Sequence, residues 1–197
     1  EEHLENLTVL ITKSENIDDT AEIIYNNCIS NRFYSELYSE LYHSLIYDKQ
    51  FLIFKTLLDN KKDLIFDLYN NVEYISAEEN YDKYCKNKKH NEDVVRSTTT
   101  FYSYLSQKKL LQIEFIYKII FFFFEKIKEK QNHNIIFEFI ENINIILNIT
   151  KSNIKQDGNF QLIIDELNKI KSKNDVYSHI NNKIQCKTMD ILDFLDL

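Results

Sequence analysis

Apolar residues recur at helical spacing along most of the chain. Ile17, Ala21, Ile24 and Cys28 lie at i, i+4, i+7 and i+11, which puts them on one face of an α-helix. A second apolar stripe runs through residues 33–45 after a gap of only a few residues. Two helices joined by so short a link run antiparallel. The pattern therefore predicts a helical hairpin at the beginning of the chain.

The same spacing continues to the end of the sequence. The further stripes run through residues 51–58, 64–68, 94–105, 116–127, 136–146, 160–167 and 180–195. Residues 80–93 are the most polar stretch, and they predict a loop or a weak helix. Residues 76–79 read Ser-Ala-Glu-Glu, a capping box that predicts a helix start. Residues 157–159 predict the clearest break, and Asp175 is expected to cap the last helix.

About ten helices fit into these 197 residues, which makes five hairpins of close to 40 residues each. That spacing is the period of HEAT-type repeats, whereas a plain helical bundle has fewer and longer helices. We therefore expect an all-α fold, an α-solenoid of about five antiparallel HEAT-type hairpins, in one domain covering residues 1–197. The chain does not begin with Met, so it is expected to be a fragment of a longer protein.

Composition supports the prediction of helices and limits what can be expected of nucleic-acid binding. The chain has one glycine, Gly158, and no proline, so tight β-turns and a many-stranded sandwich are disfavoured. The net charge is −7, so the chain as a whole is not a trap for nucleic acid. Local basic clusters lie within residues 86–90, at residues 108–109 and within residues 126–130. They are expected to be solvated helix surface, with weak RNA backbone contact as the alternative.

Cysteine content and hydropathy bear on location. Cys28, Cys85 and Cys186 are far apart and odd in number, as suits a reducing compartment and a cytoplasmic protein. The four phenylalanines at 121–124 are followed at once by charged residues. They predict a buried helix rather than a membrane span, and no signal peptide is recognised.

No residue pattern typical of an enzyme is present in the sequence. The five histidines are dispersed, and there is no glycine-rich loop for a nucleotide or dinucleotide. Cys85 and His90 lack a second ligand pair nearby, so neither a metal nor a cofactor is expected. Asp190 and Asp193 share a helix face, but without a neighbouring base they favour a cap, an ion pair or a contact surface. We expect a protein that is not an enzyme.

One short motif has two interpretations. Residues 47–53 begin with Tyr47 and carry Leu52 and Ile53, the Tyr-x4-Leu-apolar pattern of helical peptides that dock onto the cap-binding protein. The segment also continues a predicted core stripe, and 13 tyrosines make a chance match unsurprising. We expect these side chains to pack in the core.

Three stretches, in order, resemble one known family. Residues 16–41 carry a helix that ends in an apolar-Ser step, followed by a helix opening with Phe33. Residues 96–111 begin with Arg96 and run through Phe101 to a leucine pair. The last stretch closes with Asp-Ile-Leu-Asp at residues 190–193. Together they resemble the middle domain of eukaryotic translation initiation factor 4 gamma.

The resemblance spans about residues 16–195, with departures. In this family Cys often occupies the position of Tyr42, and an arginine usually lies near Lys183 or Ile184. Lysine does not reproduce the bidentate geometry of a guanidinium group. Contacts that need that arginine in relatives are therefore in doubt here.

The resemblance implies a function in translation initiation and protein biosynthesis. Such domains are HEAT-type scaffolds that bind and stimulate a DEAD-box RNA helicase, with the cap-binding protein engaged through flanking regions. The expected partner-binding residues, at the two ends of the array, are Asn31, Arg32, Lys183, Lys187, Asp190 and Asp193. Phe33, Leu37 and Leu41 are expected in the core, and the domain is expected to be a monomer. The alternative is a related scaffold in mRNA splicing or decay, or a helical adaptor unconnected with RNA.

Overall fold

The computed structural model describes residues 2–155 and 158–195. It is 79% helical, and the described residues contain no strand. The predicted all-α class is therefore confirmed. A helix that has an apolar face must bury that face against its neighbours.

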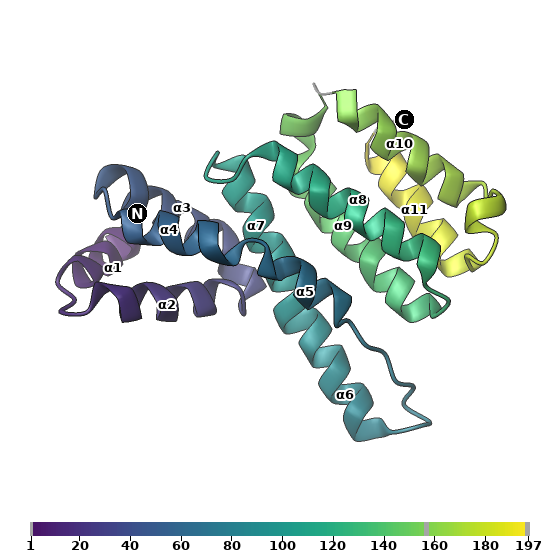
Figure 1. The fold of residues 1–197 in the computed structure, drawn as a ribbon, viewed down its shortest axis with the longest axis horizontal. Helices are drawn as coiled ribbons and strands as arrows, with labels where there is room; N and C mark the ends of the chain where they lie inside the picture. Colours follow the sequence, from purple (N-terminus) through teal and green to yellow (C-terminus); the bar gives the residue numbers. More distant parts are fainter. Residues whose placement is uncertain (1, 156–157, 196–197) are drawn as a thin grey trace.

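Most helices coincide with the predicted apolar stripes, and Figure 1 shows how the helices are arranged. In chain order the α-helices are α1 (Glu2–Thr12), α2 (Ile17–Cys28), α3 (Ser35–His43), α4 (Leu52–Lys61), α5 (Leu64–Asn70), α6 (Tyr81–His90), α7 (Arg96–Gln107), α8 (Ile113–Glu129), α9 (His133–Ile154), α10 (Gly158–Lys171) and α11 (Asn182–Phe194). Short 3-10 turns lie at η1 (Arg32–Tyr34) and η4 (Asp175–Tyr177). Wider π-helical turns extend α3 through η2 (Ser44–Asp48) and join α6 to α7 through η3 (Asn91–Val95). Helix α1 was not among the predicted elements.

Helix α7 lies at the centre of the molecule (Figure 1). It packs most extensively on α9 and also contacts α2, α3 and α8. The first four helices lie to one side of it, while α8 to α11 lie to the other, with α10 and α11 packed on each other. Helix α2 packs mainly on α4 and α3 mainly on α7. The principal partner of each helix in the first predicted hairpin is therefore outside that hairpin.

One apolar core runs from Ile11 to Leu195. At its centre the ring centroids of Phe123 lie 4.5 Å from Tyr69 and 5.3 Å from Phe139. Such aromatic contacts add about 0.5–1.5 kcal/mol each beyond the area they bury. Of the four phenylalanines at 121–124, Phe123 and Phe124 are buried as predicted, while Phe121 and Phe122 are only partly buried. Among the described helices, none is long and apolar enough to cross a membrane.

A buried polar network ties α5, α7 and α9 together. The Arg96 guanidinium donates to both carboxylate oxygens of Glu138, at 2.6 and 2.7 Å. The Asn142 amide nitrogen donates to the Glu138 carbonyl at 2.8 Å, and the Thr99 hydroxyl donates to the Asn142 amide oxygen at 2.6 Å. The Tyr69 and Thr99 hydroxyls are 2.8 Å apart. Buried polar groups are tolerated when each has a partner, and this network supplies the partners.

Three helix ends use a residue other than glycine in the left-handed backbone region. Gln50, Lys109 and Lys173 have φ of 57°, 61° and 49°. After α7, the amide of Leu110 donates to the Leu105 carbonyl at 2.9 Å, the six-residue bond of a Schellman cap. The left-handed conformation costs a residue with a Cβ roughly 1–2 kcal/mol. The near absence of glycine therefore lowers the stability of these turns.

Several local predictions need correction. Residues 81–90 are a regular helix, α6, although none of its residues is buried. The Ser76 hydroxyl accepts from the Glu79 amide as in a capping box, but within a turn, and Asn80 caps α6. The cap of α11 is Asn181 rather than Asp175. In the predicted break at 157–159, α10 begins at Gly158, and Asp157 lies outside the described residues.

Candidate partner-binding surfaces

The first predicted contact lies at the turn between α2 and α3. Asn31 has extended backbone at the N-cap position of η1, and its side chain makes no capping hydrogen bond. The Arg32 guanidinium lies over the Phe33 ring, 5.8 Å from its centroid. The prediction that Phe33 is a core residue is wrong, because it is 88% exposed.

Two further apolar side chains extend this surface along α3. Tyr34 is 55% exposed and Leu37 is 43% exposed, so the core assignment of Leu37 is also wrong, while that of Leu41, at 1%, is confirmed. Phe33 on η1 and Leu37 on α3 are both exposed to solvent. We name Arg32, Phe33, Tyr34 and Leu37 the α2–α3 patch.

The inward face of α3 explains why Phe33 and Leu37 are exposed. Ser35 and Ser39 are fully buried there, with the Ser39 hydroxyl donating to the Glu36 carbonyl at 2.6 Å. Small side chains let α3 approach α7 closely, and α7 presents small residues of its own. The inward face is therefore centred on serine, and the larger apolar residues at 33 and 37 are rotated into solvent. A pattern based on apolar positions alone does not detect this.

A hollow of about 460 Å³ adjoins the patch. It is lined by Arg32 and Phe33 on one side and by Glu92, Asp93 and Arg96 on the other. Arg96 is committed to Glu138, and the hydrogen bond to that carboxylate raises its pKa above the ordinary arginine value. Of the two arginines in the chain, Arg32 is the one whose guanidinium has no carboxylate partner in the described part of the chain.

The second predicted contact lies on α11, and its members have different environments. The Lys183 ammonium lies over the Phe137 ring of α9, 3.8 Å from the centroid. Lys187 is half-buried and pairs with Glu141 of α9 at 3.0 Å. Asp190 and Asp193 are exposed and, among the described residues, have no ion pair. The lysines therefore hold α11 against α9, and the two aspartates remain available to a partner.

The two contacts do not lie at opposite ends of the molecule as predicted. The α2–α3 turn packs against α7 near the centre, whereas α11 lies at one side (Figure 1). The hydroxyl oxygen of Thr98 on α7 lies 3.4 Å from the Ile29 carbonyl oxygen, so the turn lies directly against α7. The packing of the α2–α3 turn on α7, which sequence spacing does not reveal, decides this position.

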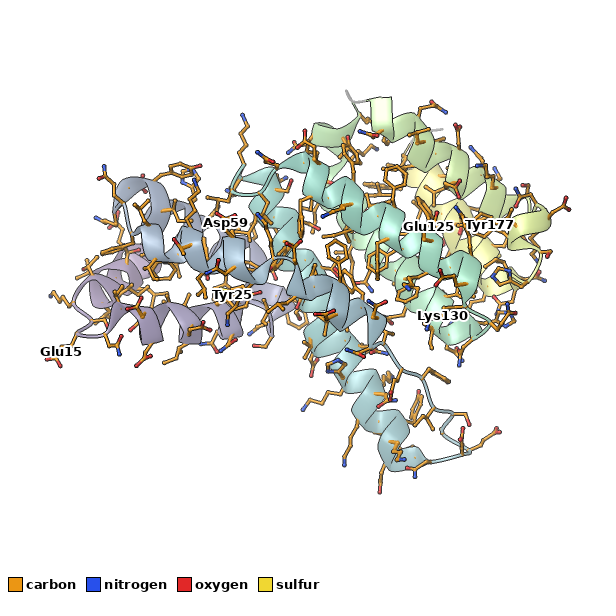
Figure 2. The ribbon with its side chains drawn as sticks, in the orientation of Figure 1. Glu15, Tyr25, Asp59, Glu125, Lys130 and Tyr177 are labelled. Atoms are coloured by element: carbon orange, nitrogen blue, oxygen red, sulfur yellow. The ribbon has the colours of Figure 1, made fainter. Side chains whose placement is uncertain are left out.

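The predicted basic cluster at 126–130 is largely neutralised by acidic neighbours. The Lys128 ammonium is 2.8 Å from Glu125 and 3.4 Å from Glu166. Figure 2 places Glu125 close to Tyr177, whose hydroxyl donates to Glu166 at 2.5 Å. Burial favours the neutral form of Glu166, but hydrogen bonds from Lys169 and Tyr177 outweigh it and lower its pKa. These groups join α8, α10 and η4 rather than presenting a free basic surface.

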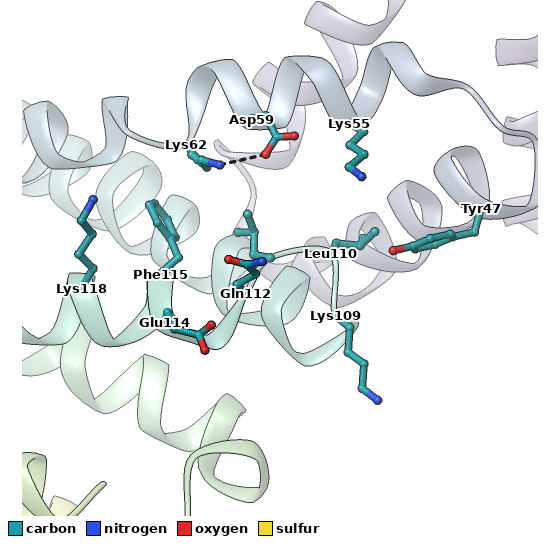
Figure 3. Close-up of a pocket in the computed structure, with 11 residues that line it drawn as sticks. Tyr47, Lys55, Asp59, Lys62, Lys109, Leu110, Gln112, Glu114, Phe115 and Lys118 are labelled. Atoms are coloured by element: carbon teal, nitrogen blue, oxygen red, sulfur yellow. Dashed lines mark hydrogen bonds and ion pairs between the residues drawn. The ribbon is translucent and has the colours of Figure 1, made fainter. Parts of the chain in front are cut away.

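A cleft of about 660 Å³ lies between α4 and the start of α8 (Figure 3). Tyr47 and Lys55 point into it, Lys62 is paired with Asp59 at 3.0 Å, and Lys109 points away. Its lining thus combines lysines with carboxylates, so its net positive charge is small. The walls of this cleft come from segments that are distant in the sequence, so sequence patterns do not reveal it.

The motif at 47–53 is only partly packed in the core, where Phe51 and Ile53 are partly buried, and it is not one continuous helix. Tyr47 is 55% exposed and Leu52 is 67% exposed, so the predicted core packing of these two residues is wrong. The chain turns at Gln50, whose φ is 57°, between η2 and α4. The spacing that suggested a docking helix is therefore divided between two elements.

Reactive groups are not assembled into a site in the described part of the chain. No three or more His, Cys, Asp or Glu side chains there could hold a metal ion. Burial raises the pKa of the Cys28 thiol well above its ordinary value, which keeps it protonated and unreactive. Burial likewise raises the pKa of Tyr42, Tyr69 and Tyr102.

Comparisons of this chain with models of known protein families, with curated proteins and with solved structures find no match.

Proposed function

We propose that the protein is a translation initiation scaffold similar to the middle domain of initiation factor 4 gamma, which binds a DEAD-box RNA helicase and stimulates it. The helices are proposed to form an α-solenoid of HEAT-type hairpins. In this arrangement the group formed by the first four helices packs on α7, and α7 packs on the group formed by α8 to α11. Catalysis resides in the partner, and the domain contributes binding energy alone.

The observation that carries the proposal is the exposed α2–α3 patch. It combines a solvent-facing phenylalanine, a tyrosine and a leucine with the one arginine that is free of a carboxylate partner in the described residues. Aromatic residues and arginine dominate the energetics of protein interfaces. The patch belongs to residues 16–41, one of the three stretches that carry the family resemblance.

A second contact is proposed at Asp190 and Asp193 on α11. These carboxylates lie on one helix face and are available for basic groups of a partner, whereas Lys183 and Lys187 are engaged with α9. The two contacts lie on different groups of helices, joined through α7 and α9.

The mechanism proposed is stabilisation of the closed helicase. A DEAD-box helicase has two lobes that close on ATP and RNA. A scaffold that binds both lobes better in the closed arrangement raises the population of that state in proportion to its difference in affinity. The partly buried Arg96–Glu138 pair and its network join α7 to α9, and so help to hold the two contacts at a fixed separation.

The test is to titrate the domain into the translation-initiation DEAD-box helicase of the same source and to measure both complex formation without RNA and RNA-stimulated ATP turnover. Phe33→Ser with Arg32→Glu is expected to weaken the complex by about 30-fold or more, the loss of one interface hot spot. Asp190→Lys with Asp193→Lys is expected to weaken binding of the other lobe alone.

Matched controls separate binding from general surface change. Leu162 is 52% exposed on α10, and Leu162→Ser removes an exposed apolar side chain of similar character without touching either patch. Unchanged affinity for this variant and loss for the patch variant support the proposal. Absence of a complex and of stimulation with the unaltered domain would refute the helicase assignment.

A further inference from the structure

Helix α6 and the loop before it form a projection from the body of the molecule (Figure 1). The loop, residues 71–80, is the longest non-helical stretch in the described part of the chain. Its first half is anchored, because the Asn91 amide nitrogen donates to the Glu73 carbonyl at 3.2 Å. The ring of Tyr74 also meets that of Tyr84 on α6 edge to face, with centroids 6.1 Å apart. The loop therefore runs beside α6.

Among the described residues, the second half of the loop is held by local hydrogen bonds. Ser76 is half-buried, and residues 77–80 are exposed. The Glu79 amide donates to the Ser76 hydroxyl oxygen at 3.1 Å, and the Asn80 amide donates to the Ser76 carbonyl at 3.1 Å. Opening this turn into an extended conformation therefore gives up only a few hydrogen bonds, and solvent can replace them.

Carboxylates follow Ser76 in the sequence. Residues 77–79 read Ala-Glu-Glu, so Glu78 and Glu79 lie two and three residues after the serine, and both are exposed. No lysine or arginine lies within five residues of Ser76 on either side. A basic recognition surface would therefore bind this segment without charge repulsion. Acidophilic serine/threonine kinases, which recognise carboxylates that follow the serine, select this pattern.

We propose that Ser76 is a phosphorylation site for an acidophilic serine/threonine kinase, with Glu79 as the main recognition carboxylate. The Ser76 hydroxyl oxygen attacks the γ-phosphorus of ATP, and the bond from that phosphorus to the bridging oxygen of the departing ADP breaks. The hydroxyl proton passes to the catalytic aspartate of the kinase. The hydroxyl must reach the γ-phosphate inside the kinase cleft, in line with the breaking bond. A serine in an exposed loop that opens easily meets this requirement.

The same spacing of hydroxyl and carboxylate occurs at three other positions, and the structure disfavours each. Thr12 and Thr56 lie in α1 and α4, where presenting the hydroxyl to a kinase cleft would require the helix to unfold. Ser172 follows α10, but Lys171 and Lys173 flank it in the sequence. These lysines would repel the basic recognition surface of such a kinase. Ser76 is therefore the preferred site.

The phosphorylated product has opposite charges close to it in the chain. In the described residues, the four lysines of α6, at positions 83, 86, 88 and 89, have no carboxylate within ion-pair distance. Residues 71–90 carry as many carboxylates as lysines. Phosphoserine adds about −2, so phosphorylation of Ser76 would change this projection from balanced to acidic.

The experiment incubates the full chain with casein kinase II and ATP and follows the product by mass spectrometry of the intact chain and of its peptides. One phosphate, a gain of about 80 Da, is expected on Ser76. Ser76→Ala is expected to prevent this gain. The matched control, Ser172→Ala, is expected to keep it. An unaltered chain that carries phosphate elsewhere, or none, while Ser76 stays unmodified would overturn the proposal.

Two charge variants test how the site is recognised. Glu79→Gln removes the carboxylate three residues after Ser76 and is expected to lower kcat/KM about tenfold or more, the loss of one hydrogen bond to a charged group. Glu73→Gln makes the same charge change three residues before Ser76 and is expected to keep kcat/KM within about twofold. Equal losses for the two variants would contradict the recognition role of Glu79.

A synthetic peptide of residues 70–84 tests whether the folded chain exposes the site. The folded chain is expected to be phosphorylated with kcat/KM within about tenfold of the peptide, because opening the turn gives up few hydrogen bonds. Rapid phosphorylation of the peptide without phosphorylation of the folded chain would overturn the proposal. The helicase titration uses chain that has not met the kinase, so failure here leaves the proposed scaffold function unaffected.

Discussion

Helices α6 and α7 belong to one continuous helical run, yet their environments are opposite. Of the twelve residues of α7, nine are buried, while α6 has no buried residue. Neither helix is rich in aliphatic residues, and α7 reads Arg-Ser-Thr-Thr-Thr-Phe-Tyr-Ser-Tyr-Leu-Ser-Gln. Average polarity therefore does not decide which half of the run enters the core.

The kind of polar side chain decides it. In α7 the hydroxyls of Thr98, Thr100 and Ser103 donate to the carbonyls four residues earlier, at 2.8, 2.7 and 2.8 Å. A hydroxyl that donates to a carbonyl of its own helix can be buried without leaving an unsatisfied hydrogen-bond donor. A lysine ammonium has no such local acceptor and must stay hydrated. The α6 lysines therefore hold α6 outside the core.

The largest expected loss of stability comes from replacing Glu138, the acidic member of the polar network. Glu138 is 7% exposed and accepts both guanidinium bonds of Arg96. Glu138→Ala leaves the partly buried Arg96 without its partner and is expected to lower the free energy of unfolding by about 3 kcal/mol, the lower end of the range for breaking a buried pair. This change in the free energy of unfolding is measured by chemical denaturation, with circular dichroism as the signal.

The control for this variant is Glu92→Ala in η3, where the carboxylate is exposed at the hollow beside Arg96. It is expected to change stability by about 0.5 kcal/mol or less. Equal losses for the two variants would mean that the Arg96–Glu138 pair contributes no more than a surface charge.

A smaller effect is expected from enlarging a small buried residue of α7. Ser103 is fully buried and its hydroxyl bonds the Thr99 carbonyl at 2.8 Å. Ser103→Leu adds volume where α7 is closely packed and is expected to cost about 1–3 kcal/mol. Thermal and denaturant unfolding would both report it. A leucine that stabilises at this position would show that the small side chain is not required by the packing.

The smallest effect is expected from the same substitution on α6. Lys86→Leu introduces leucine at an exposed position of a helix with no buried residues, and the two residues have similar helix propensity. The free energy of unfolding is expected to stay within about 0.5 kcal/mol of the original. A loss comparable to that of Ser103→Leu would indicate that α6 packs against another part of the protein in solution.

Long apolar stripes were the reliable part of the prediction. The stripes at 116–127 and 136–146 correspond to α8 and α9, whose inward residues, such as Ile116 and Ile143, are fully buried. The prediction was less reliable for segments with weak apolar periodicity. Residues 80–93, which contain α6, were predicted to form a loop or a weak helix, because a helix without an apolar face has no periodicity to detect.

The candidate site was predicted only in part. Asp190 and Asp193 are exposed on one face of α11, as the i, i+3 spacing indicates. Phe33 was assigned to the core because large apolar residues are usually buried. The buried serines of α3, which turn Phe33 outward, carry no hydrophobic signal. Whether these residues bind a helicase remains a prediction.

The sequence by itself determined that the protein is helical, because apolar spacing and the scarcity of glycine and proline act within each segment. It also determined where the unneutralised lysines of α6 lie along the chain. The tertiary structure alone decided which polar residues are buried, since Arg96 and Glu138 meet only when α7 packs on α9. It also decided that Phe33 and Tyr81 face solvent, because exposure depends on which neighbours cover a residue, and those neighbours come from distant parts of the chain.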